Sequence, residues 1–318
     1  MTSCDNAQFT NLGDGIIHID AEYMKPDLAS VYLIIEGEEC AIVETGNFQS
    51  VRVIHQVLEA HQLSPEQVRY VIPTHVHLDH AGGVGLLMQQ CANAQLVVHP
   101  KGARHMTDPA RLQAGASAVY GKDAFKKLYG ELIPVEASRV ISPQDDERIN
   151  WGSRILHFYD TPGHARHHFC IHDSISNTIF TGDTFGLSYP ALMIDTEKPF
   201  VAASTSPVQF DPEAMRGSIS RLAGSGAAAF NLTHFGRIAN TPDNAALLER
   251  TLDIYLGIAE QHKTADENRS GLLEQGMTEA LLALYRECGG TQSESVFSQT
   301  MAMDIRLNAQ GLDIWLDQ

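Results

Sequence analysis

Three histidines and an aspartate fall within six residues of this chain, and no other stretch restricts its fold and chemistry as strongly. The cluster consists of His75, His77, Asp79 and His80. It follows the apolar run from Tyr70 to Pro73, which is typical of a buried strand, and it precedes the run from Val84 to Met88, which predicts a helix. A strand therefore delivers these side chains to a loop, and a helix carries the chain away.

The spacing within this cluster fits metal ligands. Alternate residues of an extended chain point the same way, so His75 and His77 can reach one cation, while the turn at Asp79 and His80 directs those side chains to a second point beside it. Imidazole nitrogen combined with carboxylate oxygen favours zinc, iron or manganese over calcium and magnesium. The alternative is a solvated polar loop. Because the chain has only 15 histidines in 318 residues, three within six positions favour the metal site.

The motif His75-x-His77-x-Asp79-His80, followed by Ala-Gly-Gly, resembles the signature of the metallo-β-lactamase-fold hydrolase superfamily. The similarity is greatest to its hydroxyacylglutathione-hydrolase-like, or glyoxalase II-like, branch, which has a dinuclear metal centre. Three later residues, His164, Asp183 and His234, also follow β-rich runs and match this family. The resemblance implies the following ligands: His75, His77 and His164 for one ion, Asp79, His80 and His234 for the other, and Asp183 as a bridge between them.

The resemblance and the hydrophobic pattern together predict an α/β (α+β) fold. The expected architecture is a four-layer αββα sandwich, in which two sheets pack face to face with helices outside. We expect a catalytic domain at residues 1–240 and a C-terminal helical extension at 241–318 that acts as a cap or a homo-oligomerisation surface. The predicted elements include an antiparallel meander at 15–20, 30–36 and 40–44, helices at 49–61 and 108–131, and C-terminal helices from about 240, at 270–288 and at 293–307.

The implied centre supports hydrolysis of an ester-type bond in a small molecule. Two divalent ions, zinc or else iron or manganese, lower the pKa of a bridging water and supply a hydroxide at neutral pH. We expect this hydroxide to attack the carbonyl carbon of a thioester, lactone or related carboxylic ester. Asp79 is the expected catalytic residue, because it can orient the water and accept its proton. A thiolate leaves with little protonation, so thioesters suit a site without an evident strong acid.

Charge and composition restrict the partners and the location. The chain has 39 acidic residues against 22 lysines and arginines, a formal charge of -17, so nucleic acid is not an expected partner. It has no apolar stretch of eighteen residues and no export-signal pattern, so no membrane association is expected. The five cysteines form no C-x-x-C pair, which predicts reduced, mostly buried thiols and a cytoplasmic location.

Other activities on the same fold remain open from the sequence. Sulfur dioxygenases have nearly the same motif but use a single iron, so the first alternative is an oxidoreductase that consumes oxygen. The second is a phosphodiesterase, or a non-catalytic signalling member of the fold. A metal count and an oxygen-uptake measurement distinguish the first alternative from a dinuclear hydrolase.

Two further features have two interpretations each. Glu44 stands where the resembled family commonly has an Asp in an Asp-Thr-Gly turn, so it either braces the metal loop or is a strand-end carboxylate in solvent. Lys101, Arg104 and His105 are either a cationic rim for an acidic substrate or solvated surface residues.

Overall fold

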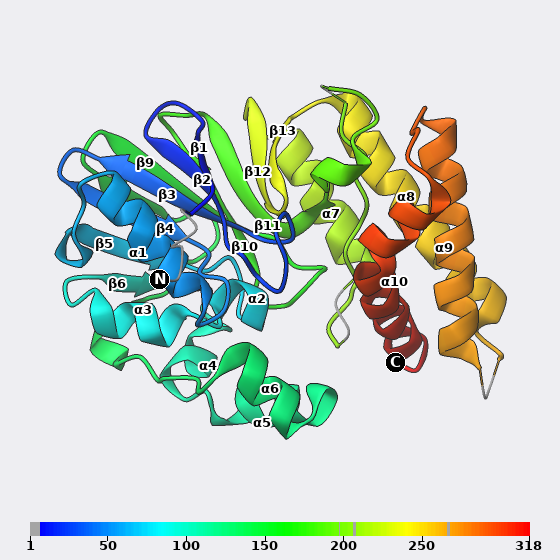
Figure 1. Ribbon diagram of the computed structural model, residues 1–318, viewed down its shortest axis with the longest axis horizontal. Helices are drawn as coiled ribbons and strands as arrows, with labels where there is room; N and C mark the ends of the chain where they lie inside the picture. Colours follow the sequence, from blue (N-terminus) through cyan, green and yellow to red (C-terminus); the bar gives the residue numbers. More distant parts are fainter. Residues whose placement is uncertain (1–6, 197, 206–207, 266–267) are drawn as a thin grey trace, which may run out of the picture. The chain divides into compact units, whose positions relative to one another are not determined.

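The computed structural model describes residues 7–318 except 197, 206–207 and 266–267, and it contains both strands and helices, with three long helices at the C-terminal end (Figure 1). The described residues form two compact units. The first unit contains residues up to 160 together with 167–180, and the second contains 161–166 together with 181–318. The expected division into domains at 1–240 and 241–318 stays a prediction.

The first sheet lies wholly in the first unit, with the strand order β1-β2-β3-β4-β5-β6-β7. Its strands are β1 (Phe9–Asn11), β2 (Ile16–Asp20), β3 (Ser30–Glu36), β4 (Glu39–Val43), β5 (Val68–Ile72), β6 (Gln95–Val97) and β7 (Val140–Ile141). β1 to β4 pair antiparallel, and β4 to β7 pair parallel. The predicted opening meander is confirmed. β1 was not predicted, because all its residues are exposed and show no apolar alternation.

The second sheet has the strand order β13-β12-β11-β10-β9-β8. Its strands are β8 (Arg148–Trp151), β9 (Arg154–Asp160), β10 (Phe169–Asp173), β11 (Thr178–Leu187), β12 (Ala229–His234) and β13 (Gly236–Ala239). β8, β9 and β10 belong to the first unit and β12 and β13 to the second, whereas β11 runs through both. Antiparallel pairing joins β8 to β9, β9 to β10 and β10 to β11, and it also joins β12 to β13.

Within the first unit the two sheets pack face to face, as predicted. Tyr32 from β3 meets Phe180 from β11 edge-on, with ring centroids 5.2 Å apart, and Tyr70 from β5 meets Trp151 from β8 at 5.6 Å. These side chains belong to one buried apolar cluster formed by strands of both sheets. Large aromatic side chains remove much apolar surface from water, so this cluster is a main source of stability in the unit.

The helices of the first unit are α1 (Ser50–Ala60), α2 (Leu78–Ala81), α3 (Val84–Gln90), α4 (Ala103–Thr107), α5 (Ala110–Tyr120) and α6 (Lys122–Tyr129), with 3₁₀ turns η1 (Pro65–Gln67) and η2 (Ala137–Arg139). The helix predicted at 49–61 is confirmed by α1, which buries its apolar face at Val51, Ile54 and Val57. The continuous helix predicted at 108–131 is wrong, because α5 and α6 separate at Gly121. Its φ of 81° is left-handed, a conformation that glycine tolerates and an α-helix cannot contain.

The helices of the second unit are α7 (Pro212–Ala223), α8 (Pro242–His262), α9 (Arg269–Glu287) and α10 (Glu294–Leu316), preceded by the 3₁₀ turn η3 (Pro190–Leu192). Asp211, Thr241 and Ser293 cap α7, α8 and α10, because each side chain accepts a hydrogen bond from the backbone N–H three residues later. These caps fix where the helices begin.

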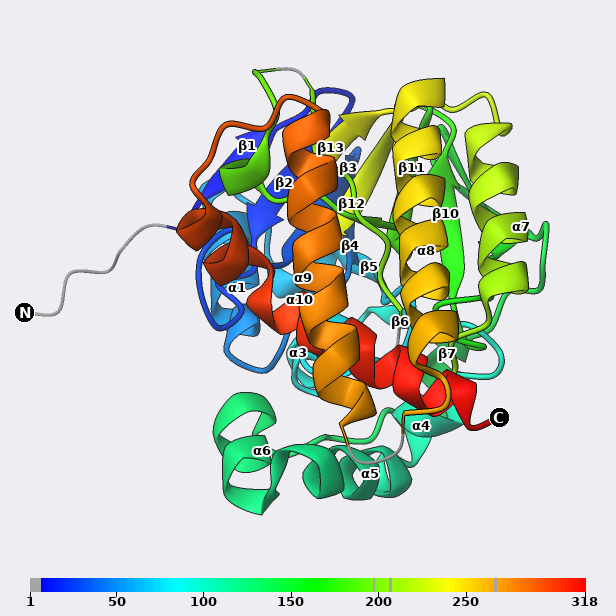
Figure 2. The ribbon, with the colours of Figure 1, turned by 90° about the vertical axis from the view of Figure 1, so that its right-hand side faces the viewer.

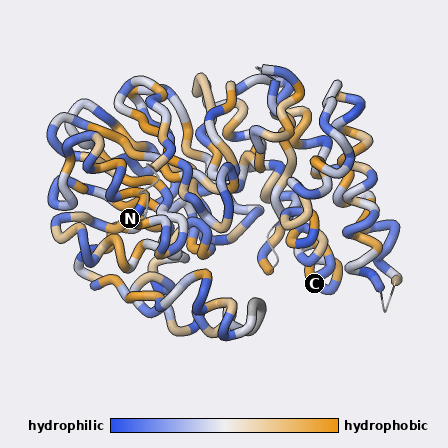
Figure 3. The backbone as a smooth tube through the Cα atoms, in the orientation of Figure 1, coloured by the Kyte–Doolittle hydropathy of each residue, from blue (hydrophilic) through white to orange (hydrophobic). Residues whose placement is uncertain are grey.

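The predicted C-terminal helices are confirmed, and the last one continues beyond 307 to Leu316. α8, α9 and α10 pack against one another, and α8 and α9 lie side by side in Figure 2. Hydrophobic and hydrophilic residues alternate along them (Figure 3), as amphipathic helices require. Among the described residues, no helix combines the length and apolar character needed to cross a bilayer.

The described cysteines agree with the prediction of reduced thiols. Cys40, Cys91 and Cys170 are buried and Cys288 is partly exposed, and each is a thiol rather than half of a disulfide. Cys4 lies outside the described residues.

Candidate metal centre

The first donor set consists of the predicted ligands His75, His77, Asp79 and His80, all in the first unit. His75 and His77 follow β5, and Asp79 and His80 lie in α2. Nε2 of His75 and Nδ1 of His77 lie 2.8 Å apart, and the rings of His75 and His80 have centroids 4.0 Å apart. His75 and His80 are fully buried. The structure therefore brings the donor atoms of the first motif together, as the spacing predicted.

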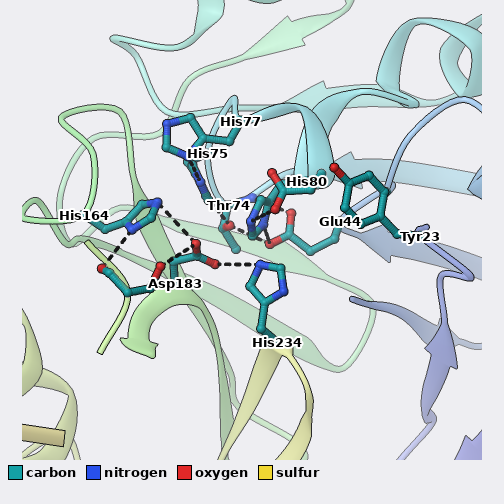
Figure 4. A network of polar contacts seen from close by, with 12 residues as sticks. Tyr23, Glu44, Thr74, His75, His77, His80, His164, Asp183 and His234 are labelled. Carbon is teal, nitrogen blue, oxygen red and sulfur yellow. Dashed lines mark hydrogen bonds and ion pairs between the residues drawn. The ribbon is translucent and has the colours of Figure 1, made fainter. Parts of the chain in front are cut away.

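Glu44 braces this donor set from the end of β4. Its Oε1 accepts hydrogen bonds from Nδ1 of His80 at 2.9 Å and from the Thr74 hydroxyl at 2.6 Å, and its Oε2 accepts the Thr74 backbone N–H at 3.1 Å (Figure 4). Glu44 is 1 % exposed, so the interpretation as a solvated carboxylate is wrong. A proton held on Nδ1 leaves Nε2 of His80 as the donor atom for a metal.

The backbone at Glu44 is held in an unusual conformation. Its φ is 65°, in the left-handed region that non-glycine residues rarely adopt. The following residue, Thr45, donates both its backbone N–H and its hydroxyl to the carbonyl of His80, each at 2.8 Å. These hydrogen bonds join the end of β4 to α2 and offset the conformational cost.

The second donor set consists of His164, Asp183 and His234, all in the second unit. His164 lies in the loop after β9, Asp183 in β11 and His234 at the end of β12. Oδ2 of Asp183 lies 3.2 Å from Nε2 of His164, and Oδ1 lies 3.5 Å from Nε2 of His234 (Figure 4). Each carboxylate oxygen thus faces a different imidazole, which is the arrangement that a bridging carboxylate needs.

His164 is held in the correct orientation by a backbone carbonyl. Its Nδ1 donates to the Ser204 carbonyl at 3.2 Å, which leaves Nε2 directed at Asp183. The Ser204 hydroxyl also donates to Oδ2 of Asp183 at 3.4 Å. The sequence did not indicate this role, because Ser204 lies in an irregular connection without a motif.

Asp304 and Tyr189 lie close to the second donor set and were also missed. The Tyr189 hydroxyl donates to both carboxylate oxygens of Asp304 at 3.1 Å. Desolvation raises the pKa of Asp304 to about 6. The electrostatic effect of His234 and the hydrogen bond from Tyr189 lower this pKa, but by less than desolvation raises it. An aspartate on a C-terminal helix gives no sequence signal of such a position, because its partners are more than 60 residues away in the chain.

A further imidazole lies beside the first donor set. The ring of His167 has its centroid 5.6 Å from that of His77 and 6.1 Å from that of His105. Burial and the nearby cations Arg104 and Arg111 lower the pKa of His105, so its imidazole is neutral at neutral pH. Of the three residues left with two interpretations, Lys101 and Arg104 therefore carry the positive charge, and both are exposed.

A small cavity of about 150 Å³ lies elsewhere in the first unit. Its walls include His99, Lys101 and Asp160, and Nε2 of His99 lies 3.1 Å from Oδ1 of Asp160. None of the predicted metal ligands lines this cavity, so it is separate from the donor sets.

The chemistry of both donor sets fits divalent metal ions. The chain contains groups of histidine and aspartate side chains that can hold a metal ion, and all seven predicted ligands belong to such groups. Imidazole nitrogens whose second ring nitrogen is hydrogen-bonded, as in His80 and His164, are typical of zinc and related metals.

Solved structures with the same fold include two prokaryotic proteins. An archaeal metallo-beta-lactamase superfamily protein, ST1585 from Sulfolobus tokodaii, matches 86 % of this chain and 99 % of its own with a TM-score of 0.61 and 23 % identity. The metallo-beta-lactamase family protein TTHA1429 from Thermus thermophilus matches 92 % of this chain and 95 % of its own, with a TM-score of 0.60 and 19 % identity. These similarities establish the fold.

Curated relatives are similar in sequence to part of the chain. The metallo-beta-lactamase fold-containing protein ST1585 of Sulfurisphaera tokodaii is 25 % identical over 179 residues, which are 55 % of this chain and 64 % of that protein, less than two thirds of its length. The human acyl-coenzyme A thioesterase MBLAC2 is 26 % identical over 213 residues, with 58 % of this chain and 67 % of that protein covered. A model of the metallo-beta-lactamase superfamily matches residues 24–228, more than half of the sequence, and the chain therefore belongs to this superfamily.

Proposed function

We propose that this protein is a metal-dependent hydrolase that cleaves thioester bonds in small molecules. The observation that carries the proposal is the geometry of Asp183, whose two carboxylate oxygens each face a different buried histidine. A carboxylate shared in this way suits a dinuclear centre, and dinuclear centres in proteins commonly serve hydrolysis. The similarity to a human acyl-coenzyme A thioesterase supports the thioester class.

We further propose that the two donor sets together hold two divalent cations, most simply zinc. The assigned ligands are His75, His77 and His164 for one ion, Asp79, His80 and His234 for the other, and Asp183 for both. The support comes from family membership, from the donor chemistry and from the hydrogen bonds that orient His80 and His164. Membership of the glyoxalase II-like branch and a cytoplasmic location stay predictions.

The protein's own residues would carry out the proton transfer and the orientation of substrate. When bound, two divalent cations would supply an activated water and polarise the substrate carbonyl. Asp79 has a partly exposed carboxylate, 27 % by its side chain, and its Oδ2 lies 3.6 Å from Nε2 of His80. Asp79 can therefore reach solvent and accept the proton of the attacking water. Glu44 holds His80 in place while this happens.

Thioesters suit this set of residues better than oxygen esters. A thiol leaving group has a pKa of about 8.5, so it departs as thiolate near neutral pH without a strong acid beside it. Coenzyme A carries negatively charged phosphates, and the formal charge of -17 on this chain does not favour them. The proposal therefore concerns acyl thioesters as a class rather than one carrier.

The experiment is a hydrolysis screen with acyl thioesters, lactones and phosphodiesters, using wild-type protein, Asp79→Asn and the matched control Asp123→Asn, an exposed aspartate in α6. We expect thioester hydrolysis that is lost in chelator, restored by zinc, reduced in Asp79→Asn and unchanged in Asp123→Asn. Chelator-resistant hydrolysis, a preference for lactones or phosphodiesters, or oxygen uptake with one iron per chain would each overturn the proposal.

A further inference from the structure

The C-terminal helix α10 reaches the second donor set through the amide of Asn308. Oδ1 of Asn308 accepts the backbone N–H of Thr205 at 2.7 Å, and its Nδ2 donates to the Ala203 carbonyl at 3.3 Å. The Thr205 hydroxyl donates in turn to the Asn308 carbonyl at 3.1 Å. Asn308 is 2 % exposed, so these bonds form away from water. One side chain of α10 thereby fixes the backbone on both sides of Ser204.

Ser204 contacts two of the ligands directly. Its carbonyl accepts the hydrogen bond from Nδ1 of His164, and its hydroxyl donates to Oδ2 of Asp183. A shift of the segment between Ala203 and Thr205 would therefore move the partner atoms of both ligands together. Asn308 controls the position of that segment.

A second path from α10 leads to His234. Asp304, one helical turn before Asn308, accepts the hydrogen bond of Tyr189 with both carboxylate oxygens at 3.1 Å. The residue before Tyr189 is Ser188, whose backbone N–H donates to the His234 carbonyl at 2.5 Å. Residues four apart share one face of a helix, so Asp304 and Asn308 act from the same side of α10.

α10 is anchored near both of its ends, so it can hold Asp304 and Asn308 in fixed positions. The Ser293 side chain caps its start, and Phe297 packs in the core against Phe200 with ring centroids 6.0 Å apart. Near its end, Trp315 packs edge-on against Phe210 at 6.1 Å. The connection that carries Tyr189 and Ser204 is thus packed against α10 at several points along its length.

We propose that Asn308 and Asp304 are positioning residues for the ligands His164, Asp183 and His234. α10 then has a role in the metal centre itself, beyond the cap or oligomerisation surface expected from the sequence. This inference rests on the proposed metal centre. Hydrogen-bond partners behind metal ligands typically change metal affinity about 10- to 100-fold when they are removed, because they fix the orientation of the donor atoms.

The test compares metal binding by Asn308→Ala with that by Asn244→Ala, measured by competition with a chelator for zinc and by the absorption spectrum of the cobalt(II) form. Asn244 is a matched control on α8: it is buried, and its Nδ2 donates to the Ala239 carbonyl at 2.9 Å, outside the segment from Ala203 to Thr205. Melting of the metal-free variants measures any general loss of stability. We expect Asn308→Ala to bind zinc about 10- to 100-fold more weakly and to change the cobalt spectrum, and Asn244→Ala to do neither.

Asp304 provides an independent pair of variants in case Asn308→Ala does not fold. Asp304→Asn keeps an oxygen that accepts the Tyr189 hydrogen bond, so we expect near wild-type zinc affinity, whereas Asp304→Leu should lose affinity. Equal zinc affinity in wild type, Asn308→Ala and Asp304→Leu would overturn the inference, even in a protein that hydrolyses thioesters. Conversely, a protein that hydrolyses no thioester but loses zinc affinity in these variants would overturn the proposed function and retain this inference. A wild-type protein that binds no zinc or cobalt would overturn both.

Discussion

Glu44 holds His80 from 36 residues away, with Oε1 of the carboxylate 2.9 Å from Nδ1 of the imidazole, and both side chains are buried. The same carboxylate receives the hydroxyl and backbone N–H of Thr74, so three donors share two oxygens. The extra methylene of Glu relative to Asp does not prevent the bracing role. The positive φ of the residue is part of this arrangement, because it turns the end of β4 toward the metal loop.

Replacing Glu44 by Gln should weaken metal binding without unfolding the protein. An amide has one oxygen and would direct its NH₂ at a donor, so one buried hydrogen bond is lost, at a cost of about 1–3 kcal/mol of stability. We expect zinc affinity to fall about 10- to 100-fold in a chelator competition. Glu44→Asp keeps both oxygens and should lose less. Equal zinc affinity in wild type and Glu44→Gln would show that Glu44 does not orient His80.

Asp79→Asn should reduce thioester hydrolysis about 10²- to 10⁴-fold, because the amide cannot accept the proton of the attacking water. The measurement is kcat at saturating thioester, with the metal content determined on the same sample. A lowered kcat with metal retained assigns Asp79 to proton transfer, whereas a fall that follows the metal content assigns it to binding alone. Unchanged kcat would exclude both roles.

Breaking the buried ion pair of Arg154 should destabilise the first unit more than breaking an exposed ion pair. Arg154 is 3 % exposed and contacts Oδ2 of the fully buried Asp173 at 2.8 Å. Arg154→Met leaves the Asp173 charge without this partner, which should cost about 3–5 kcal/mol in urea unfolding. The control Arg52→Met removes an ion pair with Glu22 whose arginine side chain is 57 % exposed, and it should cost about 0–1 kcal/mol. Similar losses of unfolding free energy in the two variants would contradict the expectation that the buried pair matters more.

The cysteines should differ strongly in reactivity. Burial raises the pKa of the Cys40 and Cys91 thiols to about 12, so the thiolate fraction of each at pH 8 is on the order of 10⁻⁴. Peptide mapping after brief alkylation of the native protein should find Cys288 labelled well before either. Rapid labelling of Cys40 at pH 8 would contradict the expected difference in reactivity.

The same two thiols make stability depend on pH. Since both folded pKa values lie above the unfolded one, the contribution of these thiols to the free energy of unfolding is present below about pH 9 and is lost as the pH rises toward 12.

The first donor set could be predicted from the sequence because its residues are adjacent in the chain. A strand, a loop and a helix place His75, His77, Asp79 and His80 close together by local geometry alone, and the structure agrees. The second donor set needed the family resemblance, because His164, Asp183 and His234 are far apart in sequence. Their convergence depends on the pairing of strands that local patterns do not specify.

The residues behind the ligands could not be predicted. Asn308 contacts Thr205 across 103 residues, and Tyr189 contacts Asp304 across 115, so neither pair leaves a local signal. Short elements were missed for a related reason. β13 has four residues and a single buried side chain, Ile238, which is too little alternation to identify a strand. The break at Gly121 was missed because an isolated glycine is also tolerated inside helices.

The central claim is that one chain holds two divalent ions through a carboxylate that both share. The most direct measurement is the number of zinc ions bound per chain, determined by calorimetric titration of metal-free wild-type protein and Asp183→Ala. We predict two ions for the wild type and at most one for Asp183→Ala, because each oxygen of Asp183 faces a different histidine. One ion or none in the wild type, or two ions held with unchanged affinity by Asp183→Ala, would contradict the account.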